Sequence, residues 1–146
     1  MRSEATAAAT HSASGSAGGV HLDDDLAVLQ RERIALLEEL ATPGAPNPRD
    51  VILDVYLSDI PVRLQSLRSA AAADDFELIT RTAHSIKGAS ANIGALRVAE
   101  LARRVELAAS DDELPSGAVL RALEEEFERL RGFILSEVLG QAGEDA

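Results

Sequence analysis

The residues of this chain that could do chemistry gather in one short stretch, AHSIKGAS, at positions 83–90. His84 is the one histidine beyond residue 21, and Lys87 is the one lysine among 14 basic residues. An imidazole is a nucleophile near neutral pH, and an ammonium group is a compact cation on a flexible stem. Because residues three apart share one face of a helix, the two side chains are expected to lie side by side.

Helical geometry separates this pair from the core of the protein. At about 100° per residue, the apolar arc of the helix is centred roughly 120° away from His84. This arc holds Phe76, Ile79, Ala83, Ile86 and Ser90. The residues within about 40° of His84 are Glu77, Thr80, Gly88 and Ala91, and Arg81 and Lys87 lie about 60° to either side. His84 is therefore predicted to stand on an exposed face.

Gly88 makes this exposed face unusual. A glycine inside a helix costs about 1 kcal/mol relative to alanine, and it leaves the surface beside His84 bare. Taken singly, His84 and Lys87 are consistent with ordinary surface residues. Their combination with Gly88 instead favours a face that a large partner approaches closely.

Composition excludes several classes of function. A net charge of −11 argues against binding to nucleic acid or to an anionic membrane surface. The absence of cysteine excludes disulfides and thiolate metal sites and suits a cytoplasmic location. No apolar run approaches the roughly 18 residues of a membrane span, and the first residues do not resemble a signal peptide. His11 and His21 lack partner ligands, so no metal site is expected.

The elements that must position His84 are predicted to be helices only. The chain is rich in Ala, Leu, Glu and Arg and lacks the β-branched and aromatic runs that are typical of strands. Residues 1–20 are predicted to form a disordered tail, 21–140 a helical domain and 141–146 a flexible C-terminal tail.

The expected helices follow from their capping residues and apolar spacing. The first spans about 23–41, and the second runs from the cap Asn47 to residue 72 with a kink at Pro61. The third begins at a capping box formed by Asp74 and Glu77, and the fourth spans 95–109 after a reversal at 93–94. The last follows Ser116 and continues to 138. These helices predict an all-α fold, an antiparallel up-and-down four-helix bundle with an additional N-terminal helix.

The motif resembles that of histidine-containing phosphotransfer (HPt) domains, which reads His-x-x-Lys-Gly-x-Ser-x-x-x-Gly-Ala. Here it runs from His84 through Lys87, Gly88 and Ser90 to Gly94 and Ala95. The segment VILDVYLSDIPVRLQSLRSAAAADDFELIT upstream and LARRVE downstream also resemble the family, so that the likeness covers roughly residues 48–135.

The resemblance implies that His84 carries a phosphoryl group and that Lys87 places its ammonium near it. Lys87 could instead form a salt bridge with Glu100 or Asp75. Glu106 faces inward on the fourth helix, and the family often has a Gln or Glu there that hydrogen-bonds the histidine Nδ1. Its alternative is an ion pair with Arg103 or Arg104. Gly88, Thr80, Ala91 and Arg81 are expected to line the docking face, and Ser90 and Gly94 are expected to serve close helix packing.

The implied function is that of a stand-alone phosphorelay intermediate and not an enzyme with its own ATP site. The implied partners are response-regulator receiver domains and a hybrid sensor histidine kinase, with Mg²⁺ on the receiver and no cofactor on this chain. The chain is expected to be a monomer. One alternative is a helical-bundle adaptor that binds a receiver or a kinase without carrying phosphate. Another is that the chain is a fragment of a larger sensor kinase.

Overall fold

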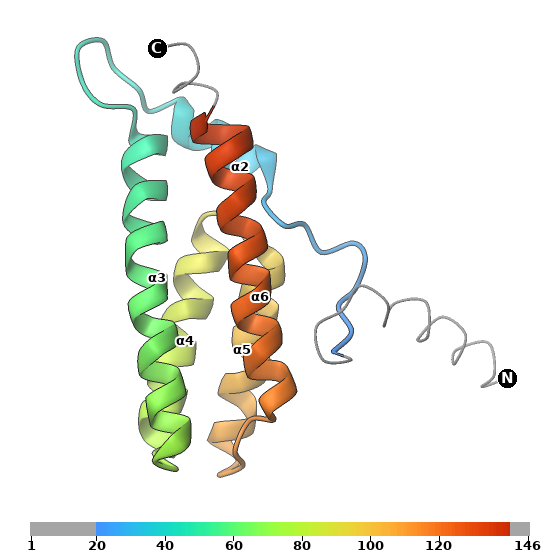
Figure 1. Ribbon diagram of the computed structural model, residues 1–146. Coiled ribbons are helices and arrows are strands. Elements are labelled where there is room, and N and C mark those ends of the chain that lie inside the picture. Colours follow the sequence, from blue (N-terminus) through green and yellow to red (C-terminus); the bar gives the residue numbers. More distant parts are fainter. Residues whose placement is uncertain (1–19, 141–146) are drawn as a thin grey trace, which may run out of the picture.

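The computed structural model describes residues 20–140, and over these residues the regular structure is entirely helical. Five α-helices are followed by one π-helix (Figure 1). The elements are α2 (Arg31–Glu38), α3 (Pro48–Ala72), α4 (Phe76–Asn92), α5 (Leu96–Ser110), α6 (Gly117–Phe133) and η2 (Ile134–Leu139). The prediction of an all-α fold is thus confirmed.

Helices α3 to α6 form an up-and-down bundle. In Figure 1, α3 and α6 lie in front, α4 and α5 lie behind, and successive helices run in opposite directions. The closest packing is between α4 and α5, which are joined by only three residues, 93–95. The largest fully buried side chains come from all four helices and include Leu53, Ile60, Ile79, Ile86, Leu101, Leu123, Phe127 and Leu130. A contiguous apolar core therefore fixes the rotation of α4 about its axis.

The helix starts follow capping chemistry, with one correction. The Asn47 side chain accepts a hydrogen bond from the Arg49 amide, and the Ser116 side chain accepts one from Val119, as expected of N-caps. The predicted capping box at Asp74 is wrong. Asp75 caps α4 by accepting from the Leu78 amide, because Asp74 adopts a left-handed conformation with φ of 54° that ends the preceding turn.

Helix α3 continues as a single α-helix through Pro61. Pro61 is exposed, so the carbonyl that loses its amide partner is on a side of the helix that water can reach. The long helix that packs beside α4 is therefore one element, and the expectation that Pro61 would not divide it is confirmed.

The prediction of a first helix over 23–41 is wrong in extent, because only 31–38 is helical. The preceding residues have tertiary backbone partners instead. The Gln30 amide donates to the Gly94 carbonyl at 2.9 Å, and the Arg97 amide donates to the Ala27 carbonyl at 3.2 Å. Leu22 and Leu29 are also buried. Burial of these leucines, together with hydrogen bonds to the α4–α5 connection and to the first turn of α5, thus replaces the local helix that the acidic run suggested.

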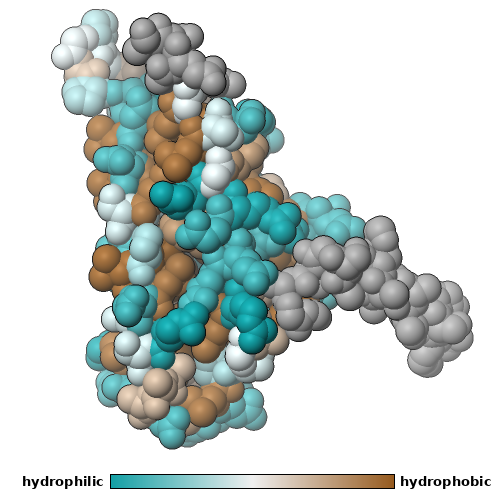
Figure 2. Space-filling view, in the orientation of Figure 1, coloured by the Kyte–Doolittle hydropathy of each residue, from teal (hydrophilic) through white to brown (hydrophobic). Residues whose placement is uncertain are grey.

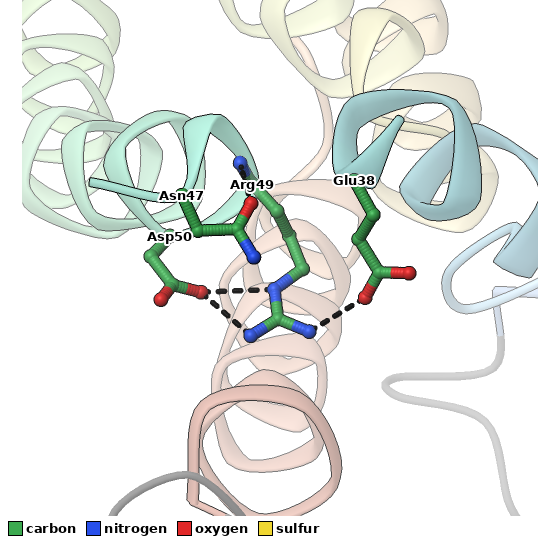
Figure 3. A network of polar contacts seen from close by, with 4 residues as sticks. All are labelled: Glu38, Asn47, Arg49 and Asp50. Carbon is green, nitrogen blue, oxygen red and sulfur yellow. Dashed lines mark hydrogen bonds and ion pairs between the residues drawn. The ribbon is translucent and has the colours of Figure 1, made fainter. Parts of the chain in front are cut away.

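Arg49 ties α2 to α3 at the end of the bundle (Figure 3). Its Nη1 lies 2.6 Å from Glu38 Oε2, and its Nε donates to Asp50 Oδ1 at 2.9 Å. The guanidinium thus bridges the last residue of α2 and the first turn of α3. A second contact holds α2 near the end of α6, where the Arg31 guanidinium lies 5.7 Å from the centre of the Phe133 ring.

The surface of the bundle differs from helix to helix. In Figure 2 hydrophilic residues cover much of the α6 face, whereas hydrophobic residues emerge along α3. Val51, Val55 and Val62 on α3 are all exposed. Over residues 20–140, no helix is both long enough and apolar enough to cross a membrane.

Candidate functional site

Helix α4 holds His84 away from the core, as its periodicity predicts. Ile79, Ala83, Ile86 and Ser90 are fully buried on one face of α4. The His84 side chain is 67% exposed. Because the four buried residues fix the rotation of α4, the His84 backbone position is fixed while its imidazole remains accessible.

Glu106 on α5 brings the histidine and the lysine together. Its Oε2 lies 2.8 Å from His84 Nδ1, and its Oε1 lies 2.7 Å from Lys87 Nζ. The Glu106 side chain is only 18% exposed. One largely buried carboxylate therefore serves two groups of α4, one with each oxygen.

The electrostatics of the site assign the histidine tautomer. Burial alone would raise the pKa of Glu106, but the hydrogen bonds from Lys87 and His84 outweigh burial and hold the pKa below its usual value. Glu106 is therefore ionised at neutral pH and can only accept hydrogen bonds. His84 Nδ1 must then carry the proton, which leaves the Nε2 of the neutral ring with its lone pair free.

The alternative ion pairs that the sequence allows for Lys87 and Glu106 do not form. Lys87 contacts neither Glu100 nor Asp75 within ion-pair distance. Arg103 and Arg104 both bind Glu100, with their Nε atoms 2.9 Å from its carboxylate oxygens. This cluster lies along α5 and leaves Glu106 to α4.

The surface around His84 is bare where the sequence predicts a docking face. A Cβ atom added at Gly88 would meet no atom within 4 Å, so helix packing does not require a glycine there. Ala91 is exposed, and the Thr80 hydroxyl donates to the Phe76 carbonyl of its own helix. Arg81 is 68% exposed. All four residues flank the imidazole without covering it.

Among the charged residues of this surface, sequence reasoning missed Arg63. It belongs to α3, 21 positions before His84, and lines a groove of about 530 Å³ together with Arg81 and His84. No local pattern places it there, because its position depends on how α3 packs beside α4.

Ser90 lies in the core beneath the surface of α4, and Gly94 follows the end of α4. The Ser90 hydroxyl is 2.7 Å from the Tyr56 hydroxyl in the core, and burial raises the pKa of Tyr56 to about 12. Gly94 has φ of 82°, and a Cβ atom there would lie 2.7 Å from the Gln30 Cβ. Both residues allow close approach of neighbouring segments.

Within residues 20–140, no three His, Cys, Asp or Glu side chains are grouped as metal ligands. His21 is exposed, and His11 lies outside the described residues, as do most of the predicted N-terminal tail and residues 141–146. The expectation that this chain needs no metal or cofactor stays a prediction.

Comparison with known proteins identifies the family. Residues 51–133 match the family model of the Hpt domain, and this range contains His84, Lys87 and Glu106. The chain belongs to the Hpt domain family. The motif resemblance is thereby confirmed.

A solved Hpt structure has the same fold. The chain is 32% identical to histidine-containing phosphotransfer protein B (HptB) from Pseudomonas aeruginosa PAO1, with a TM-score of 0.69 over 75% of this chain and 93% of that one. No curated protein matches significantly. Hpt proteins are phosphocarriers that interact with receiver domains and histidine kinases, so this Hpt chain has a histidine phosphotransfer role in a phosphorelay.

Proposed function

We propose that His84 carries the phosphoryl group and exchanges it with the aspartate of a response-regulator receiver domain. The observation that supports this most directly is the arrangement of the imidazole. Its Nδ1 is held 2.8 Å from the Glu106 carboxylate while the side chain as a whole is 67% exposed. The nitrogen that faces away from Glu106, Nε2, is the nucleophile.

The phosphoryl group can be transferred to His84 without the release of a proton from the site. The Nε2 lone pair attacks the phosphorus of the receiver's aspartyl phosphate, a P–N bond forms, and the P–O bond to the aspartate breaks with its electrons returning to that carboxylate. The ring then bears a positive charge, which Glu106 stabilises through the Nδ1–H hydrogen bond. The reverse reaction returns the phosphoryl group to an aspartate by the same steps.

Lys87 stabilises the transferred group by charge. A phosphoryl group passes through a loose transition state whose negative charge is spread over three equatorial oxygens. Glu106 holds the Lys87 Nζ at 2.7 Å on the same face as the imidazole, from where its flexible stem can turn the ammonium to those oxygens. Mg²⁺ is expected on the receiver, and this chain is expected to act as a monomeric carrier without an ATP site of its own.

The decisive experiment follows label from a phosphorylated receiver to this chain. Wild-type protein should acquire acid-labile, alkali-stable label, and His84→Gln should acquire none. His21→Gln, which removes another exposed histidine, is the matched control and should be labelled like the wild type. A stoichiometric complex with the receiver that forms without label would contradict the proposal and support the adaptor alternative.

A further inference from the structure

A groove beside His84 is lined by two arginines, although the chain as a whole is strongly acidic. Arg63 from α3 and Arg81 from α4 line it together with Thr80, Ser85, His84 and Glu106, and its volume is about 530 Å³. Because it opens next to the imidazole, any protein that delivers a phosphoryl group to Nε2 must cover it.

Two of the carboxylates nearest to the groove, Glu106 and Asp59, form close hydrogen bonds with side chains of this chain, whereas the carboxylate near Arg81 does not. Glu106 is shared between His84 and Lys87. Asp59 accepts from Arg63 at 2.5 Å, in a pair that leaves the Arg63 side chain 40% exposed.

Arg81 is the more available of the two arginines. Its nearest carboxylate, Glu77, lies at 3.9 Å, which is beyond hydrogen-bond distance. Both side chains of this pair are more than two-thirds exposed. An exposed contact of this kind contributes little energy, so the Arg81 guanidinium can turn to a partner at small cost.

The stretch of α4 around His84 also lacks negative charge. From residue 78 to residue 92 it contains Arg81, His84 and Lys87 but no Asp or Glu. The chain as a whole has 25 acidic and 14 basic residues. The cations around His84 each have one carboxylate nearby, in the pairs Arg63–Asp59, Arg81–Glu77 and Lys87–Glu106. The surface around His84 is thus close to neutral in a chain that otherwise repels anions.

The chemistry of the partner makes this exception useful. An aspartate that works with Mg²⁺ must lie among further oxygen ligands, chiefly carboxylates, because hard cations take oxygen donors. Such a surface would be repelled by a chain with a net charge of −11. Charges act over about 8 Å at physiological ionic strength, so the charges next to the site, and not the net charge of the chain, dominate the final approach.

We infer that Arg81 and Arg63 form a docking site for the carboxylate-rich rim of the partner's phosphoryl site, and that they set the rate of productive encounter. This inference rests on the proposed function. It assigns Arg63 and Arg81 to partner recognition and leaves the transfer chemistry to His84, Lys87 and Glu106.

The test compares two donors. A phosphorylated receiver domain, chosen as the fastest donor to the wild-type chain from a panel, measures docking and chemistry together. Phosphoramidate, a small donor that needs no protein surface, measures the reactivity of His84 alone. The ratio of the two second-order rate constants isolates docking.

Arg81→Glu should lower this ratio roughly tenfold at low ionic strength, and Arg63→Gln should lower it by a smaller factor. The loss should shrink as salt is added, because screening removes the attraction in the wild type and the repulsion in the variant. Arg131→Glu is the matched control, since Arg131 is also an exposed helix arginine with a carboxylate at 3.8 Å, but on α6.

Three outcomes decide the matter. A ratio for Arg81→Glu equal to that of Arg131→Glu overturns the docking site and leaves the proposed function standing. A loss that is independent of salt also overturns it, because the effect is then not electrostatic. Wild-type protein that neither donor labels overturns the proposed function itself.

Discussion

At the scale of single residues, the site depends on one carboxylate that binds two side chains. Glu106 receives the His84 Nδ1–H with one oxygen and the Lys87 ammonium with the other. It lies between α4 and α5, where an unpaired carboxylate would be costly, so the two hydrogen bonds also offset its burial. The same contacts that stabilise Glu106 thus orient the nucleophile.

Replacing Glu106 separates these effects. Glu106→Ala should slow phosphorylation of His84 by roughly 10- to 100-fold, the range typical of losing a group that orients a histidine. Glu106→Gln can still accept the Nδ1–H hydrogen bond but lacks the charge, so an intermediate rate is expected. Phosphoramidate labelling measures the rate, and ¹⁵N chemical shifts of His84 measure its tautomer. An unaltered tautomer and rate in Glu106→Ala would rule out the orienting role.

Gly88 is expected to give a partner access to His84, because no packing contact in the fold requires a glycine there. Gly88→Gln should raise the free energy of unfolding by about 0.5–1 kcal/mol, because a glycine inside a helix is destabilising. It should nevertheless abolish transfer from a receiver, since the new side chain covers the surface beside His84. Thermal unfolding and receiver-dependent labelling measure the two effects.

The control for this change is Gly132→Gln. A Cβ atom at Gly132 also meets no atom within 4 Å, but the residue lies on α6. It should unfold like the Gly88 variant and transfer like the wild type. Equal transfer by both variants would refute the docking role of Gly88.

At the scale of elements, the α4–α5 connection places Glu106 opposite His84. Gly94 turns the chain with φ of 82°, and its carbonyl accepts the Gln30 amide from the N-terminal segment. Ala95 at the N-cap of α5 and Ala99 and Ala102 within it are buried and small, which lets α5 approach α4 closely. A short, tightly packed turn therefore sets the position of α5 along α4, and with it the residues of the two helices that lie opposite one another.

Gly94→Ala should destabilise the fold for two reasons. A left-handed backbone costs about 1–2 kcal/mol for a residue with a Cβ atom, and the new methyl group would lie 2.7 Å from the Gln30 Cβ. Gly44→Ala is the control, because Gly44 has the same φ but open space around it. Denaturant unfolding should show a larger loss for Gly94→Ala, and equal losses would show that the contact with Gln30 contributes nothing.

At the scale of the whole molecule, stability should depend on pH through paired carboxylates. The Arg103 hydrogen bond is the main cause that holds the pKa of Glu100 at about 2, with burial opposing it and Arg104 adding to it. Although burial would raise it, the pKa of Glu106 is also below its usual value, because of the hydrogen bonds from Lys87 and His84. In each case the folded state binds fewer protons than the unfolded state, so stability is present at neutral pH and is lost as the pH falls.

The pH range over which this stability is lost follows from the ordinary and the lowered pKa of Glu100. As the pH falls from about 4.5 to about 2, wild-type protein should lose the contribution of the Glu100 cluster. Glu100→Gln should be less stable than wild type at neutral pH by about 1 kcal/mol, as expected for an ion-pair cluster at the surface that is partly exposed. The difference should vanish near pH 2 in chemical denaturation. A difference that is constant with pH would contradict the assignment.

Much of the fold and half of the site could be predicted from the sequence, because these features depend on local geometry. Helical periodicity alone places Ile79, Ala83 and Ile86 inward and His84 outward, and the structure has the same division. Capping residues predict where α3 and α6 begin. Lys87 and Gly88 share the face of His84 simply because they follow it by three and four residues.

Only the tertiary structure decided between the partners that the sequence left open for Glu106, and only the tertiary structure revealed Arg63. Glu106 reaches His84 Nδ1 across 22 positions, and Arg63 lines the groove from α3, because core packing fixes the rotation of three separate helices. The residues before Arg31 are not helical because their backbone forms hydrogen bonds with the α4–α5 connection and with the first turn of α5. Periodicity determines the face on which a side chain lies, whereas the group opposite that face depends on contacts between residues far apart in the chain.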